Sequence, residues 1–167
     1  MSYEIETVRI KLVKGPSWFS DKPLNSTKAV AEAMAKELSE CDREMFCVLN
    51  CATDGKVINM NVVSMGTLNY SLVSAREVFK SSILSNAAYI IAVHNHPSGN
   101  VEPSLVDQLI TQNLRDAGEV LGIELKDHVI VGGDKGEYFS FQEEGILWND
   151  FREEQRKEMR ERYEVER

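Results

Sequence analysis

The strongest chemical signal in the sequence lies between residues 94 and 107, where two histidines and an aspartate fall close together. His94 and His96 are two residues apart, and side chains at i and i+2 of an extended segment point to the same side. Asp107 follows His96 by eleven residues, and we expect it in the first turn of a helix. Two imidazole nitrogens and one carboxylate leave a fourth tetrahedral position open for water, which is typical of catalytic zinc. The spacing therefore predicts a divalent metal site, with zinc as the preferred ion.

Hydrolysis of an amide-type bond at such a site also needs a group that accepts and returns protons. Glu44 is a candidate because it begins a predicted strand, and the Ser104 hydroxyl could donate to the developing oxyanion. A simpler interpretation exists for each residue. Glu44 could be a solvated charge before a strand, and Ser104 with Asp107 has the spacing of a capped helix N-terminus. Spacing alone leaves these alternatives open.

Other residues of metal-binding type receive no role. His128, within LKDHVIV, is interpreted as a structural histidine, and Glu102 as a solvent-facing loop acid. The cysteines Cys41, Cys47 and Cys51 are odd in number and never form C-x-x-C. We therefore expect buried thiols rather than disulfides or a sulfur-ligated zinc site.

The elements around the metal-binding residues follow from hydrophobic periodicity. The apolar run 87–93 predicts a central strand, buried on both faces, that leads directly into His94. Residues 95–103 contain two prolines and a glycine and predict a loop, after which Ser104 begins a long helix. Two strands that begin near Glu44 and Lys56 flank the turn signal at residues 53–55 and predict an antiparallel hairpin.

The rest of the chain completes a mixed sheet with helices packed on it. We predict an edge strand at 3–13, a helix capped by Asn25 or Ser26, a helix opened by an S-x-x-E capping box at 74–77, and strands at 124–132 and 137–141. From Leu147 the composition becomes highly charged with balanced signs, which predicts an appended helix. The predicted organisation is one domain at 1–146 and a charged helical tail at 147–167.

Composition narrows the classes of function. The 167 residues suit a single domain, and no apolar run approaches the roughly 18 residues that a membrane span needs. Nineteen basic against 27 acidic residues give a net charge of -8, which disfavours nucleic-acid binding. The N-terminus lacks the pattern of a secretion signal, so we expect a cytoplasmic protein without membrane partners. The charged tail could mediate a homo-oligomer.

The string HNHPSG, followed by Ser104 and Asp107, resembles the RadC-type branch of the JAMM (MPN/JAB) metalloprotease superfamily. The segments DREMFCVLN and AGEVLGIELKDHVIVGG also resemble family segments, so that the resemblance covers most of residues 20–142. It implies a cytidine-deaminase-like, three-layer α/β/α fold with a mixed sheet. It also implies zinc held by the residues matching His94, His96 and Asp107, Glu44 as the catalytic glutamate and Ser104 as the serine of S-x-x-D.

The function implied by this resemblance is zinc-dependent hydrolysis of peptide or isopeptide bonds, with a protein or peptide as substrate. Characterised relatives in the wider superfamily cleave isopeptide bonds to ubiquitin-like proteins, whereas the motif does not identify a substrate here. A catalytically silent scaffold of the same fold is one alternative. A DNA-repair-associated protein is another, from the traditional label of the branch. A zinc deaminase would need H-x-E and P-C-x-x-C, whereas this chain has H-x-H.

Overall fold

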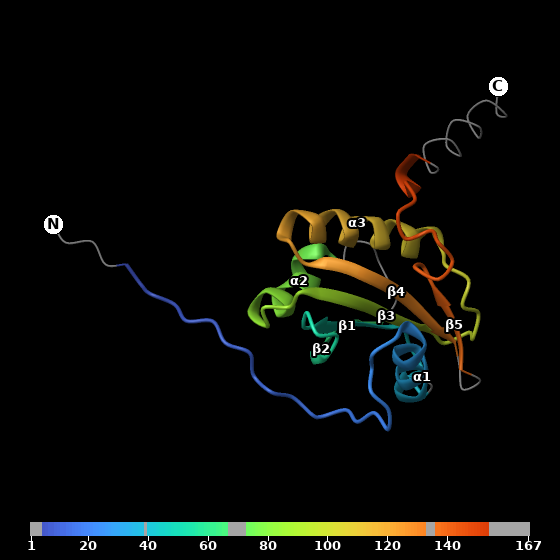
Figure 1. The fold of residues 1–167 in the computed structure, drawn as a ribbon, viewed down its shortest axis with the longest axis horizontal. Coiled ribbons are helices and arrows are strands. Elements are labelled where there is room, and N and C mark those ends of the chain that lie inside the picture. The colour runs from blue at the N-terminus through green and yellow to red at the C-terminus, as the bar shows by residue number, and fades with distance from the viewer. Residues whose placement is uncertain (1–4, 39, 67–72, 133–135, 154–167) are drawn as a thin grey trace.

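A five-stranded sheet in the order β2-β1-β3-β4-β5 forms the centre of the computed structural model, which describes residues 5–38, 40–66, 73–132 and 136–153. The helices are α1 (Thr27–Leu38), α2 (Ala75–Leu84) and α3 (Leu105–Leu121), and the strands are β1 (Met45–Cys51), β2 (Val57–Met65), β3 (Tyr89–His96), β4 (Glu124–Gly132) and β5 (Glu137–Ser140). β3 and β4 are parallel, and the other neighbours are antiparallel. α2 and α3 cover one face and α1 the other (Figure 1). The predicted three-layer α/β/α fold with a mixed sheet is confirmed.

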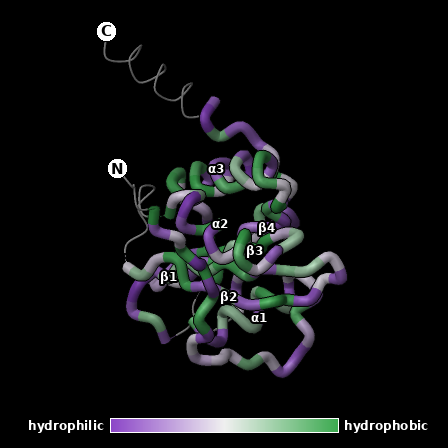
Figure 2. Tube along the Cα trace, turned by 90° about the vertical axis from the view of Figure 1, so that its left-hand side faces the viewer, coloured by the Kyte–Doolittle hydropathy of each residue, from purple (hydrophilic) through white to green (hydrophobic). Residues whose placement is uncertain are grey.

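Two apolar clusters, one on each face of the sheet, form the core. Along β3, Ile90 and Ala92 belong to the cluster that includes residues of α2 and α3, whereas Ile91 and Val93 belong to the cluster that includes residues of α1. Figure 2 shows the hydrophobic stretches of the strands lying between the helices. Because side chains alternate along a strand, His94 continues the series that faces α3. The strand runs to His96, three residues beyond the predicted apolar run.

The predicted hairpin is confirmed, and it brings the start of β1 to the end of β3. The Ala52 amide donates to the Lys56 carbonyl at 2.9 Å, and Gly55 takes the positive φ of +87° that this turn needs. β1 then pairs antiparallel with β3, with Phe46 opposite His94. If this pairing is continued by two residues, position 44, immediately before β1, lies opposite His96 at the end of β3.

The helix N-termini follow the predicted caps in two cases and depart from them in one. The Ser26 hydroxyl accepts from the Ala29 amide at 3.2 Å, and Ser104 forms a capping box at the start of α3. Ser74 is the N-cap of α2, but its side chain makes no capping hydrogen bond, so the predicted capping box at 74–77 is wrong. Glu77 instead forms an ion pair with Lys80 one turn further along the helix.

The predicted edge strand at 3–13 is also wrong over its described part, because residues 5–13 form no strand. Ile5, Val8 and Ile10 are 87%, 82% and 74% exposed. Ile5 occupies an odd position, whereas Val8 and Ile10 occupy even ones, so the segment has no continuous apolar face to bury on a sheet. Residues 1–4 lie outside the described ranges.

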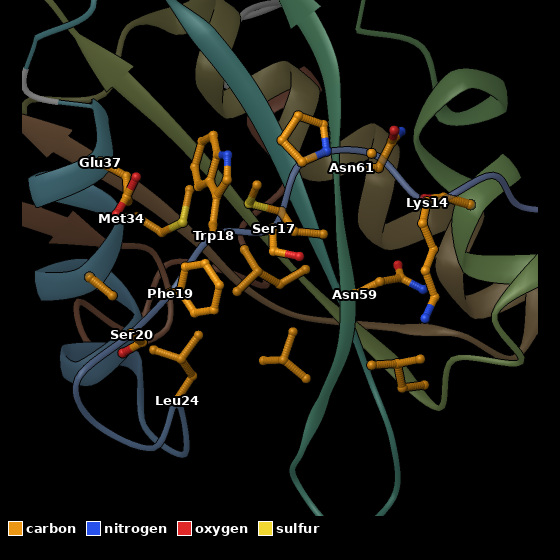
Figure 3. Close-up of a pocket in the computed structure, with 18 of the residues that line it drawn as sticks. Lys14, Ser17, Trp18, Phe19, Ser20, Leu24, Met34, Glu37, Asn59 and Asn61 are labelled. Atoms are coloured by element: carbon orange, nitrogen blue, oxygen red, sulfur yellow. The ribbon is translucent and has the colours of Figure 1, made fainter.

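The segment that follows these residues borders a groove of about 780 Å³ between α1 and β2 (Figure 3). Trp18 and Phe19 of this segment, Met34 of α1 and Met60 of β2 are among its lining residues. None of the three predicted metal ligands lines this groove. This groove therefore lies on the α1 side of the molecule and is separate from the metal-binding residues.

The first residues after β5 continue the domain core. Leu147 and Phe151, which we assigned to the tail, are buried in the same cluster as Phe141. The Arg115 guanidinium on α3 donates to the carbonyls of Leu147 and Asn149, at 3.3 and 3.0 Å. The division at 146 stays a prediction, and residues 154–167 of the predicted tail helix lie outside the described ranges. Within those ranges, every helix is too short or too polar to cross a lipid bilayer.

Candidate metal centre

The structure brings the three predicted metal ligands together, since β3 supplies His94 and His96 and the first turn of α3 supplies Asp107. The two Nε2 atoms are 3.1 Å apart. Asp107 Oδ1 lies 3.2 Å from His94 Nε2, and Oδ2 lies 3.5 Å from His96 Nε2. His94 and Asp107 are buried, whereas His96 is partly exposed. These residues form a group that could hold a metal ion.

The distances within this group agree with the geometry of a tetrahedral zinc site. Nitrogen and oxygen ligands lie about 2.0–2.2 Å from zinc, so two of them at tetrahedral corners are about 3.4 Å apart. The observed separations of 3.1, 3.2 and 3.5 Å bracket that value. Two imidazole nitrogens and a carboxylate aimed at one point are all electron-pair donors, and such a set needs a cation or protons between its members. The chemistry of these residues therefore fits a divalent ion.

The orientation of His96 is fixed by the loop that follows β3. His96 Nδ1 lies 2.6 Å from the Asn100 carbonyl oxygen, which can only accept, so Nδ1 carries a proton and Nε2 is the ring nitrogen that faces Asp107. The loop itself rests on Gly132 of β4. A Cβ at position 132 would lie 2.5 Å from the Gly99 carbonyl oxygen. Only glycine therefore lets the loop approach closely enough to hold His96.

Asp107 is both a ligand candidate and part of the helix cap. The Ser104 amide and hydroxyl donate to Asp107 Oδ2 at 2.8 and 2.6 Å, and the Asp107 amide donates to Ser104 Oγ at 3.2 Å. The capping interpretation of these two residues is confirmed, and the proposed oxyanion role of Ser104 stays a prediction. Burial raises the pKa of Asp107, but its contacts with the His94 and His96 imidazoles and the hydrogen bond from Ser104 outweigh burial and hold the pKa far below its usual range. Asp107 is therefore an anion in the folded chain.

Glu44 lies immediately before β1, on the same face as Phe46 by alternation along the chain. Continuing the register of Phe46 opposite His94 brings Glu44 opposite His96. The pKa of His96 is raised, mainly by its hydrogen bond to Asp107 and to a smaller extent by the charge of Glu44. Glu44 therefore lies beside the end of β3 that carries the metal-binding residues, and its catalytic role stays a prediction.

Asn95 holds the backbone on both sides of Glu44. Its side chain lies on the face opposite to the two histidines, accepts from the Met45 amide at 2.8 Å and donates to the Arg43 carbonyl at 3.1 Å. Asn95 is only 4% exposed, so these two bonds are shielded from water. A single strand thus carries two metal-ligand candidates on one face and the support of Glu44 on the other.

His128 was predicted to be a structural histidine, and it is completely buried behind His94. His128 Nε2 lies 2.9 Å from His94 Nδ1, and His128 Nδ1 lies 2.6 Å from the Thr111 hydroxyl. Its ring stacks on Phe141 with a centroid distance of 5.1 Å. Burial lowers the pKa of His128 well below its ordinary value, with a smaller contribution from the charge of His94. His128 is therefore neutral, with one ring proton.

Five residues support the candidate site without having been given a role from the sequence: Asn95, Asn100, Thr111, His128 and Gly132. A usable signal existed for two of them. Asn95 alternates with the two histidines, and Thr111 lies one helical turn after Asp107. His128 could not be placed because contact with His94 depends on β4 pairing beside β3. Glu102 is exposed, in agreement with its interpretation as a solvent-facing acid.

Comparison with known proteins shows the family that the chain resembles. A family model described as the RadC-like JAB domain matches residues 24–146. A UPF0758 protein of Desulfitobacterium hafniense is 44% identical over 124 residues, which cover 74% of this chain and 54% of that protein. A UPF0758 protein of Rubrobacter xylanophilus is 41% identical over 140 residues, 83% of this chain and 59% of that protein. A UPF0758 protein of Methanosarcina mazei is 40% identical over 126 residues, which cover 75% of this chain and 54% of that protein. The chain spans little more than half the length of these relatives.

Proposed function

The chain belongs to the RadC-like JAB domain family, and from that membership and its His-His-Asp group we propose that it is a zinc-dependent hydrolase of peptide or isopeptide bonds. The observation that carries the proposal is the convergence of His94, His96 and Asp107, with separations of 3.1, 3.2 and 3.5 Å that suit a tetrahedral ion. A bound zinc ion would supply a Lewis acid that lowers the pKa of water and polarises the scissile carbonyl.

Glu44 is the proposed general base and general acid. Its carboxylate takes a proton from the attacking water as the new carbon–oxygen bond forms, and it returns that proton to the nitrogen as the carbon–nitrogen bond breaks. Proton transfer of this kind needs a carboxylate that stays in one place through both steps. The hydrogen bonds that Asn95 accepts from the Met45 amide and donates to the Arg43 carbonyl support this role, because they fix the backbone on either side of Glu44.

Ser104 is the proposed donor to the oxyanion that develops on the carbonyl oxygen. Ser104 is the N-cap of α3, and its hydroxyl lies against Asp107 of the metal-binding group. The same hydroxyl donates to Asp107 Oδ2 in the structure, so the proton would have to leave that carboxylate when substrate binds. Asp107 Oδ2 keeps the Ser104 amide as a donor at 2.8 Å, which compensates for that loss.

The first experiment measures metal content and metal dependence together. Purified protein should hold about one zinc ion per chain, and the variants H96A and D107N should lose it. Removal of the metal with a chelator should abolish cleavage of peptide and isopeptide-linked substrate libraries, and added zinc should restore it. Absence of zinc from the wild type, or unchanged zinc content in H96A, would overturn the proposal.

The second experiment separates a hydrolase from a scaffold of the same fold. The variant E44Q should keep its zinc and lose roughly 100-fold to 10,000-fold in cleavage rate, the usual range for a general acid–base residue. E102Q is the matched control, because it makes the same change at an exposed acid of the neighbouring loop. Full zinc occupancy with no cleavage by the wild type of any library member would favour the scaffold.

A further inference from the structure

Two buried residues behind His94, Thr111 of α3 and His128 of β4, have no part in the chemistry proposed above. We propose that Thr111 and His128 form a hydrogen-bonded chain that keeps the proton of His94 on Nδ1 and so leaves Nε2 free for a metal ion. The proposal rests on the metal binding in the proposed function. It makes both residues positioning residues, since they act through His94 and touch no reacting atom.

The direction of the chain is set at its first link by a backbone carbonyl. The Thr111 hydroxyl lies 2.7 Å from the carbonyl oxygen of Asp107, one helical turn earlier, and a carbonyl can only accept. A hydroxyl has a single proton, so once Thr111 donates to Asp107 it has only lone pairs left. His128 Nδ1, at 2.6 Å from Thr111 Oγ1, must then be the donor of the second link. The proton of the His128 ring is therefore on Nδ1.

The third link transfers this direction to the metal-binding group. His128 is completely buried and lies against the rings of Phe46 and Phe141, a setting that holds a neutral imidazole with a single proton, and that proton on Nδ1 leaves a lone pair on Nε2. His128 Nε2 lies 2.9 Å from His94 Nδ1, which must donate to it. His94 Nε2 is then left with its lone pair directed between His96 and Asp107. The second ring nitrogen of a metal-bound histidine generally has such a partner, which fixes both the tautomer and the orientation of the ring.

The surroundings of this chain preserve its hydrogen bonds. Thr111, His128 and His94 are all 0% exposed, so water does not compete for the donors and acceptors. The rings of Phe46 and Phe141 lie against His128, at centroid distances of 5.4 and 5.1 Å. The opposite direction would take the Thr111 proton away from the Asp107 carbonyl and would put a proton on His94 Nε2, inside the metal-binding group. Only donation from His94 to His128 and from His128 to Thr111 leaves His94 Nε2 with a lone pair for an ion, beside His96 and Asp107.

Nitrogen NMR of the metal-free protein tests the chain without reference to metal or activity. Nitrogen chemical shifts distinguish protonated from unprotonated ring nitrogens, and the protein has only three histidines to assign. His128 should carry its proton on Nδ1 near neutral pH, which is the tautomer that free histidine disfavours. A proton on His128 Nε2 in the wild type would mean that the chain runs the other way, and it would overturn the proposal.

Zinc affinity tests the consequence for His94. T111V removes the hydroxyl and should weaken zinc binding by about 10-fold to 100-fold, the usual cost of losing a group that orients a ligand. T111S keeps a hydroxyl and should restore most of the affinity. T27V is the matched control, because Thr27 donates to Asp127 at 2.9 Å from α1, on the other face of the sheet. T27V should leave zinc affinity unchanged.

The outcomes separate this proposal from the proposed function. Equal zinc affinity in T111V, T111S and the wild type would overturn the positioning role. If the wild type binds no divalent metal but His128 carries its proton on Nδ1, the proposed function fails and the hydrogen-bonded chain stands. If T111V loses zinc affinity while T111S and T27V keep it, and His128 carries its proton on Nδ1, the result supports both the proposed function and the hydrogen-bonded chain.

Discussion

Gly132 lies at the end of β4 and is not a metal-ligand candidate. A single methyl group added at this position should nevertheless disturb the metal centre, because it would displace the loop that holds His96. In G132A the new Cβ would lie 2.5 Å from the Gly99 carbonyl oxygen and 2.7 Å from Val101 Cγ1. Ordinary contacts begin near 3.4 Å, so the loop must retreat by about 0.9 Å. The same shift at the adjacent Asn100 carbonyl would lengthen its 2.6 Å contact with His96 Nδ1 to about 3.5 Å. That distance exceeds the range of a hydrogen bond.

The expected result is a loss of zinc affinity by about 10-fold to 100-fold, because His96 loses the group that orients its ring. Overpacking should also lower the free energy of unfolding by about 1–3 kcal/mol. Competition with a chromophoric zinc chelator measures the affinity, and thermal unfolding in the presence of a chelator measures the stability of the metal-free chain.

The matched control is G118A, near the other end of α3 from Asp107. Its Cβ would collide with the Ile123 carbonyl oxygen, so both variants place a methyl group against a backbone carbonyl. The eleven residue steps from position 107 to position 118 span roughly 16 Å of helix. G118A should therefore be destabilised and keep zinc affinity within about twofold of the wild type. Equal zinc affinity in G132A and the wild type would refute the reasoning, and so would an equal loss of affinity in the two variants.

Three further predictions concern the rest of the domain. Burial raises the pKa of Cys47 to about 12 and that of Cys51 to about 11, so a maleimide reagent near neutral pH should label only Cys41 in the folded chain, as peptide mass mapping would show. D127A removes the shared acceptor of two hydroxyl groups from α1 and β5 and one backbone amide, and it should cost about 2–4 kcal/mol in chemical unfolding. R115A releases two carbonyls of the segment after β5, so proteolysis should cut that segment faster than in the wild type; equal cutting rates would contradict this.

The fold could be predicted where the local sequence pattern and the final packing agree. The apolar run before His94 suits a buried strand and residues 53–55 suit a tight turn, which predicts β1, β2 and β3 correctly. The prediction of an edge strand is wrong over the described residues 5–13 because a strand also needs a partner and one apolar face. Neither requirement is visible in a short alternating segment.

The sequence predicted the metal-binding residues of the candidate site, but it did not predict the residues that hold them in place. His94, His96 and Asp107 lie within fourteen consecutive residues, so their relation is local and their spacing carries the information. His128 meets His94 across 34 positions of sequence, and only the pairing of β3 with β4 brings them together. Gly132 matters because of one close backbone approach, which leaves no periodic signal in the sequence.

The alternation along β3 has a consequence for changes in chain length. His94 and His96 face the metal-binding group, and Asn95 between them holds the backbone beside Glu44. An insertion or deletion of one residue within β3 would exchange the two faces of the strand. It would remove both histidines and the support of Glu44 in a single step, and no substitution elsewhere could restore them. Length variation should therefore be tolerated at the turn of residues 52–56, and excluded from the strand that carries the two histidines.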